Sequence, residues 1–243
     1  MVRGRLFGVG VGPGDPELMT VKAVRVINEC GAIAIPTETI EKCTAYQIAK
    51  QTANVSCKKI IPVPVPMTKD RIVLKKAYEK GIKDIEEALE KGDDVAFLNL
   101  GDPTVYSTYM GIHSRIKADG YYAEIVNGVT SFCAVAGRLG INLAKNKESI
   151  HIYPAAYDND DMLTVKGTRV LMKSASRLGE VKHKLLEMEK NGLIDAGAVT
   201  DCTMESETVY DSIEKIFLPG ISLYLSVASV NLHLSIKRTG ILY

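Results

Sequence analysis

Short apolar strands alternate with amphipathic helices through the first half of the chain, and this alternation limits the possible folds most. Residues 95–100 (VAFLNL) are almost entirely apolar, which is typical of a strand covered on both faces. Residues 69–91 form a helical pattern with an apolar side, which ends at Gly92. Strands joined by helices pair in parallel, so the pattern predicts an α/β fold with a mostly parallel sheet. The expected strands are 5–10, 32–35, 60–65, 95–100 and 122–126, and the expected helices are 21–27, 69–91 and 104–118.

A second α/β pattern begins near Asn127. We therefore expect two domains, an N-terminal α/β domain over 1–126 and a C-terminal α/β domain over 127–243. The expected elements of the second domain are helices 130–139 and 176–191 and strands 149–153, 168–172, 196–201 and 222–230.

The composition is that of a soluble globular protein. Of 243 residues, 46% are hydrophobic and 24% are charged, which excludes disorder. The 30 basic and 29 acidic side chains give a net charge of +1, so we expect no general affinity for nucleic acid or anionic membranes. No apolar run approaches the roughly 18 residues of a membrane span, and no apolar signal core follows Arg3 and Arg5. We expect a cytoplasmic protein.

The cysteines and histidines do not predict a metal site. The cysteines are odd in number and scattered, which favours reduced thiols over disulfides. The histidines have no ligand spacing such as HExxH, so no metal is expected. The residues in question are Cys30, Cys43, Cys57, Cys133 and Cys202, with His113, His151, His183 and His233.

Glycines alternate in the loop after the first strand, GVGVGPGD, at Gly8, Gly10, Gly12 and Gly14. Glycine lets the backbone approach a ligand closely and adopt a positive φ. The spacing is not GxGxxG, and Pro13 removes an amide where a pyrophosphate would bind, so a Rossmann dinucleotide site is excluded. A simple glycine-rich turn is the alternative interpretation.

A second loop, Gly101-Asp102-Pro103, follows the apolar strand 95–100. Asp102 either caps the next helix, with Pro103 opening it, or meets a polar ligand. Thr130 and Ser131 open another helix after Gly128, where helix capping is the first interpretation. Parallel sheets bind ligands at the carboxyl ends of their strands, so two such loops at one edge indicate a binding site.

Five segments follow one another along nearly the whole chain, and in this order they resemble the tetrapyrrole methylase family, the S-adenosylmethionine-dependent enzymes of corrin and sirohaem synthesis. Together with PMTKD (66–70), they are most similar to the branch that methylates precorrin-2, or its cobalt complex, at C20. The segments are GVGVGPGDPELMTVKA (8–23), LGDPTVYST (100–108), NGVTSFCAVAGRLGINLA (127–144), VLMK (170–173) and YLSVASVN (224–231).

The resemblance implies two α/β domains with the active site in the cleft between them, and a homodimer. It implies S-adenosyl-L-methionine as methyl donor, S-adenosyl-L-homocysteine as product, and a small tetrapyrrole as substrate. Substrate contacts are expected at Gly12, Arg138 and Lys173. The basic side chains of Arg138 and Lys173 would meet the carboxylates of the macrocycle rim. The cofactor contacts carried over by position are Pro13, Gly101, Asp102, Val105, Tyr106, Thr130, Ser131, Met172, Cys202 and Ser226.

Methyl transfer from a sulfonium is an in-line displacement that depends mainly on positioning. The sequence identifies no catalytic base. Three alternatives stay open: diphthine synthase, which methylates a protein side chain, another tetrapyrrole methylase of the same fold, and a non-catalytic nucleotide-binding module.

Overall fold

The structure is a computed structural model that describes residues 2–64, 71–154, 165–172, 178–215 and 233–237. The chain divides into two compact units, 1–130 and 131–243. The following paragraphs treat each unit by itself.

The first unit is built on a five-stranded sheet in the order β3-β2-β4-β1-β5. All four strand pairings are parallel, and Gly8 of β1 lies between Phe97 of β4 and Ile125 of β5. The expectation of an α/β fold with a parallel sheet is confirmed. The strands are β1 (Arg5–Gly10), β2 (Ala32–Ile35), β3 (Lys59–Pro62), β4 (Val95–Asn99) and β5 (Tyr122–Val126).

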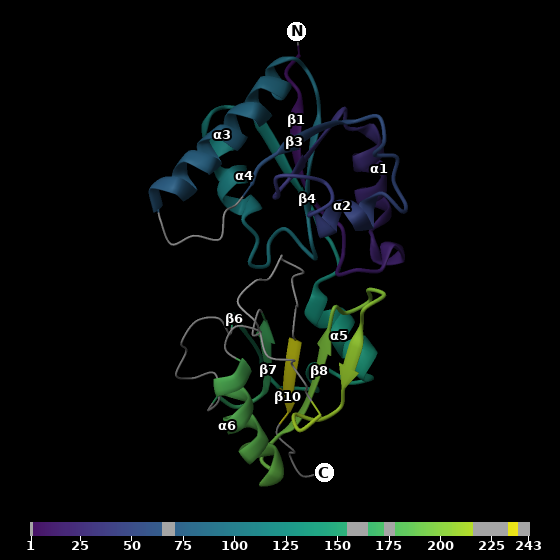
Figure 1. The fold of residues 1–243 in the computed structure, drawn as a ribbon, viewed down its shortest axis with the longest axis vertical. Coiled ribbons are helices and arrows are strands. Elements are labelled where there is room, and N and C mark those ends of the chain that lie inside the picture. The colour runs from purple at the N-terminus through teal and green to yellow at the C-terminus, as the bar shows by residue number, and fades with distance from the viewer. Residues whose placement is uncertain (1, 65–70, 155–164, 173–177, 216–232, 238–243) are drawn as a thin grey trace. The chain divides into compact units, whose positions relative to one another are not determined.

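Helices cover both faces of this sheet (Figure 1). Successive strand residues point to opposite faces, so Phe7 and Val9 belong to the core with α1 and α2, while Leu6 and Phe97 belong to the core with α3 and α4. This double covering explains why β4 is fully buried. The helices are α1 (Val21–Glu29), α2 (Thr44–Ala49), α3 (Arg71–Glu90) and α4 (Tyr109–Ala118), with a 3-10 turn at Pro16–Leu18.

The second unit has a mixed sheet in the order β6-β7-β10-β8-β9. β6 and β7 are parallel, whereas β10 is antiparallel to both of its neighbours, β7 and β8. Because β7 and β8 both run opposite to β10, their carboxyl ends lie at the same edge of the sheet. The strands are β6 (Ile150–Pro154), β7 (Thr168–Met172), β8 (Asp195–Thr200), β9 (Thr208–Tyr210) and β10 (His233–Lys237).

Two helices, α5 (Ser131–Leu139) and α6 (Leu178–Lys190), pack on this second sheet. Leu185 of α6 shares a buried cluster with Leu171 and Ala198, while Val135 of α5 packs with Val199. The two clusters use opposite faces of β8, because neighbouring residues of a strand point in opposite directions.

The described structure differs from the expected elements in three respects. The helix expected over 104–118 begins only at Tyr109, because Tyr106 has a φ of 48° and breaks the helical path. Three short elements, α2, β9 and β10, are not among the predictions. The strand expected over 222–230 lies outside the described residues.

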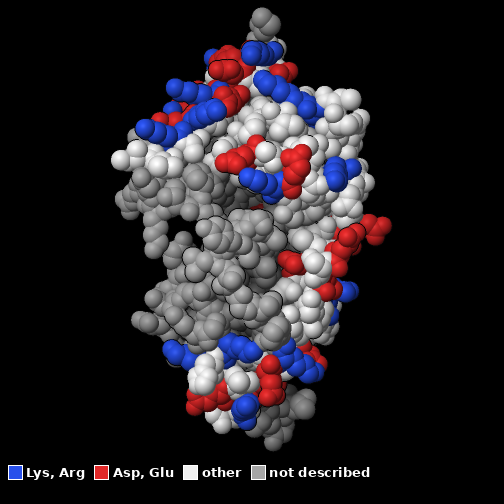
Figure 2. All heavy atoms as spheres, viewed as in Figure 1, with Lys and Arg blue, Asp and Glu red and all other residues white. Residues whose placement is uncertain are grey.

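Basic and acidic side chains lie next to one another on the described surface, as Figure 2 shows for one face. A shallow depression on α3 is itself lined by both signs: Lys83, Glu86, Glu87, Glu90 and Lys91. Within the described ranges, no helix is long and apolar enough to cross a bilayer.

Candidate active site

The two glycine loops of the first unit are joined to each other at the carboxyl ends of β1 and β4. The amide of Gly101 donates to the carbonyl of Gly12 over 2.8 Å, and the amide of Gly12 donates to the carbonyl of Gly101 over 3.3 Å. Both glycines have a left-handed backbone, with φ of 76° and 70°, which is a conformation that glycine adopts without strain. The loops that the sequence singled out therefore form one backbone platform at one edge of the sheet.

A third loop, which follows β5, meets this platform backbone against backbone. A Cβ atom at Gly10 would lie only 2.6 Å from the Gly101 carbonyl oxygen and from the Gly128 amide nitrogen. A Cβ atom at Gly128 would overlap the same carbonyl oxygen. The close approach of the three loops thus requires glycine at 10 and 128.

Asp102 ties these loops together through hydrogen bonds. Its side chain is buried and accepts four hydrogen bonds: from the Thr104 amide at 2.8 Å and hydroxyl at 2.5 Å, and from the Asn127 side chain at 3.1 Å and the Gly128 amide at 3.0 Å. Burial alone would raise the pKa of this carboxyl, but the four donors outweigh burial and lower the pKa below its ordinary value of 3.8. Asp102 is therefore ionised at neutral pH, and it positions the loops instead of capping α4.

Tyr106 has an unusual backbone conformation in the middle of the 102–108 loop. Its φ of 48° is uncommon for a bulky residue, and 42% of its surface is exposed. The loop is held on the far side of this residue, where the Ser107 hydroxyl donates to the buried Asn99 amide oxygen over 2.6 Å and accepts from the Tyr109 amide. Strained residues of this kind cluster at binding sites.

The first unit thus brings together most of the residues predicted there. Gly12, Pro13, Gly101 and Asp102 are buried in the joined loops, Val105 is half-buried beside Tyr106, and Thr130 is half-buried at the end of the third loop. Ser131 is half-buried and begins α5 in the second unit.

In the second unit, Met172 and Cys202 are both buried at the same edge of the sheet, since Met172 ends β7 and Cys202 follows β8. Cys202 packs with Val135 and Val199, and burial raises the pKa of its thiol to about 12. Its side chain is therefore a neutral core group. Lys173 and Ser226 lie outside the described residues.

Arg138 has a partner within the protein. Its Nε donates to Glu207 Oε1 over 2.7 Å, and its Nη2 forms an ion pair with the same oxygen. The sequence predicted Arg138 as a substrate contact, but two of its donor atoms are already committed to Glu207.

Sequence reasoning missed the residues that hold the loops in place: Asn99, Ser107, Asn127 and Glu207. One signal could have found Asn99, because an amide side chain inside an otherwise apolar strand must have a partner. Nothing in the sequence pairs Glu207 with Arg138.

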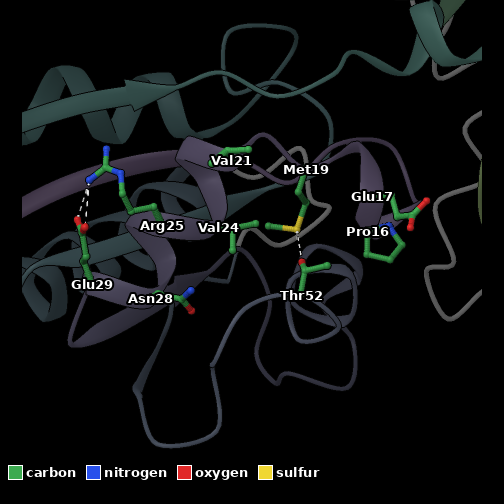
Figure 3. A pocket seen from close by; sticks show the side chains of 9 residues that line it. All are labelled: Pro16, Glu17, Met19, Val21, Val24, Arg25, Asn28, Glu29 and Thr52. Atoms are coloured by element: carbon green, nitrogen blue, oxygen red, sulfur yellow. Dashed lines mark hydrogen bonds and ion pairs between the residues drawn. The ribbon is translucent and has the colours of Figure 1, made fainter.

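A separate surface pocket of about 560 Å³ lies on the outer side of α1 (Figure 3). It contains an Arg25–Glu29 ion pair and a hydrogen bond from Thr52 to the Met19 sulfur. None of the predicted site residues lines it. All five cysteines are free, and within the described part of the chain no cluster of three or more His, Cys, Asp or Glu residues could hold a metal ion.

Comparison with known proteins identifies the family of this chain. The family model of the tetrapyrrole (corrin/porphyrin) methylases matches residues 5–216. The chain is a tetrapyrrole methylase. The resemblance stated from the sequence motifs is confirmed.

One curated relative of this tetrapyrrole methylase is a probable cobalt-precorrin-2 C(20)-methyltransferase from Methanocaldococcus jannaschii. It is 32% identical over 228 residues, which cover 93% of this chain and 95% of the relative. Among solved structures, a cobalt precorrin-4 methyltransferase has a TM-score of 0.71 at 16% identity and covers 96% of this chain and 94% of its own. A uroporphyrin-III C-methyltransferase from Thermus thermophilus, complexed with S-adenosyl homocysteine, has a TM-score of 0.65 at 19% identity, over 96% of this chain and 97% of its own. These two structures share the fold of this methylase.

Proposed function

We propose that this tetrapyrrole methylase transfers a methyl group from S-adenosyl-L-methionine to C20 of precorrin-2 or cobalt-precorrin-2, in cobalamin biosynthesis. The observation that carries the proposal is the 32% identity to a probable cobalt-precorrin-2 C(20)-methyltransferase across nearly the full length of both chains. The motifs that resemble the C20 branch of the family support the same substrate.

The glycine platform suits a bulky cofactor that binds against backbone. A Cβ atom at Gly101 would have no neighbour nearer than 3.9 Å, so the space beside this residue is open to a ligand. The four hydrogen bonds of the buried Asp102 hold these loops in a fixed shape around that space. The residues present therefore fit S-adenosylmethionine, which supplies an already activated methyl group.

The residues proposed to hold the cofactor lie in both units. In the first unit, the joined loops supply backbone at Gly101 and the exposed ring of Tyr106. In the second unit, the turn around the buried Cys202 would contact the cofactor through the partly exposed Asp201 and Thr203 beside it. The full proposed set is Pro13, Gly101, Asp102, Val105, Tyr106, Thr130, Ser131, Met172, Cys202 and Ser226.

These residues act by positioning, because a methyl sulfonium needs only an aligned nucleophile and the exclusion of water. We assign no catalytic base. Gly12 and Lys173 are proposed to face the substrate, whereas the guanidinium of Arg138 is paired with Glu207. The location of the site in a cleft between domains 1–126 and 127–243 stays a prediction, as do the homodimer and the cytoplasmic location.

Incubation with labelled S-adenosylmethionine tests the proposal. Metal-free precorrin-2, cobalt-precorrin-2 and the elongation factor that diphthine synthase modifies would be compared as acceptors under anaerobic conditions. We expect label on one or both tetrapyrroles. Label on the elongation factor alone would overturn the proposal, and binding of ATP without binding of S-adenosylhomocysteine would indicate a nucleotide-binding module.

A further inference from the structure

The turn between β8 and β9 has a strained backbone. Asp201 and Thr203 have φ of 46° and 67°, and such values are uncommon for residues other than glycine, above all for a β-branched threonine. Cys202 lies between them. A turn of this kind persists only when the surrounding structure holds it in place.

The carboxylate of Glu207 is the group that holds this turn. Its Oε2 accepts a hydrogen bond of 2.6 Å from the Thr203 amide, and its Oε1 accepts from Arg138 of α5. The Glu207 side chain is only 11% exposed, which protects these bonds from water. A further bond of 3.0 Å, from the Ser206 hydroxyl to Asp201, closes the other half of the turn.

Cys202, between the two strained residues, also fixes the turn, because it is buried. It packs with Val135 of α5 and Val199 of β8, and the whole residue is only 3% exposed. Cys202 is buried, so the partly exposed Asp201 and Thr203 on either side of it form the part of the turn that a ligand can reach at the edge where β7 and β8 end. Glu207, bonded to both Thr203 and Arg138, thus determines the shape of this backbone segment.

We propose that Glu207, braced by Arg138, is a positioning residue that holds the Asp201–Thr203 backbone in the conformation that contacts the S-adenosyl group. This inference rests on the proposed function, which puts Cys202 at the cofactor. It also assigns Arg138 a different role from the one expected from the sequence. Since its guanidinium charge is balanced by Glu207, Arg138 serves the cofactor side of the site and not the carboxylates of the substrate.

Two variants, Glu207→Gln and Arg138→Gln, test the inference, with Glu205→Gln as a matched control. Glu205 is exposed in the same turn, and its replacement removes the same charge. Calorimetry would give the dissociation constant of S-adenosylhomocysteine, and steady-state kinetics would give KM for each substrate. We expect both variants to weaken the binding of S-adenosylhomocysteine and to raise KM for S-adenosylmethionine, each by about tenfold. This is the size of the effect of one lost charge-assisted hydrogen bond. KM for the tetrapyrrole and all values of the control should stay unchanged.

Three results would contradict the inference. Variants that melt at a lower temperature but bind S-adenosylhomocysteine normally would show that Glu207 and Arg138 have only a structural role. An Arg138→Gln enzyme with a raised KM for the tetrapyrrole alone would make Arg138 a substrate contact. A wild-type protein that does not bind S-adenosylhomocysteine would overturn the proposed function, and this inference with it. If Glu207→Gln fails to fold, Arg138→Gln decides between the same outcomes.

Discussion

At the scale of single residues, the alternating glycines at positions 8, 10 and 12 lack a side chain for different reasons. Gly10 lets two other loops approach its backbone, and Gly12 has a left-handed φ of 76°. Gly8 belongs to the core instead, because a Cβ atom there would overlap the ring of the fully buried Tyr109. The sequence pattern shows four equivalent glycines, whereas the structure separates a packing glycine from glycines of the candidate site.

We predict that Gly8→Ala lowers the free energy of unfolding by about 1–3 kcal/mol, the usual cost of overpacking a core. The ring of Tyr109 cannot move freely, since its hydroxyl donates to the Glu124 carbonyl over 3.2 Å. Urea unfolding measures the effect. Gly111→Ala is the control, because the new Cβ atom would have no neighbour nearer than Tyr78 at 4.0 Å, and alanine should stabilise the helix slightly. Equal stability of the two variants would contradict the assignment.

A second prediction at this scale concerns Asp102→Asn, which replaces an acceptor by an amide whose N–H groups face donors. We expect a loss of about 1–3 kcal/mol of stability and weaker binding of S-adenosylhomocysteine. The pKa of Asp102 is lowered on folding, so its ionised form stabilises the fold above pH 3.8, and this contribution is lost as the pH falls below that value. The stability gap between wild type and variant should therefore shrink below pH 4. A gap that does not change with pH would show that the charge of Asp102 is unimportant.

At the scale of elements, the start of α4 depends on a polar contact inside the core. Ser107 links the buried end of β4 to the first residue of α4, since its hydroxyl bonds to both Asn99 and the Tyr109 amide. The residues before Tyr109 are thereby kept out of the helix and form the loop that carries Tyr106. This explains why a helical sequence pattern over 104–118 does not produce helix in its first five positions.

We predict that Ser107→Ala costs about 1–3 kcal/mol, because it leaves the Asn99 amide oxygen without this donor in a buried position. In an Asn99→Leu background the same change should cost less, since the buried acceptor is already gone. A double-mutant cycle measured by thermal unfolding gives the coupling energy. A coupling of zero would mean that the two side chains do not depend on each other.

At the scale of the whole molecule, the sequence predicts what local patterns determine. Apolar runs such as residues 95–99 identify the parallel sheet, because a strand that is buried on both faces must be apolar. The platform was only partly predictable: the three loops are visible as glycine motifs, but the hydrogen bonds of Asp102 to Asn127 and Gly128 join residues about 25 positions apart. The antiparallel β10 was not predicted, since its pairing with β7 and β8 is a long-range contact that no local pattern encodes.

The central claim, methylation at C20, is tested most directly by the position of the transferred methyl group. The protein would be incubated anaerobically with cobalt-precorrin-2 and S-adenosylmethionine carrying a 13C-labelled methyl, and the product would be examined by NMR. The proposed function predicts a single labelled methyl on the C20 meso carbon. Label at any other carbon of the macrocycle, with none at C20, would contradict it.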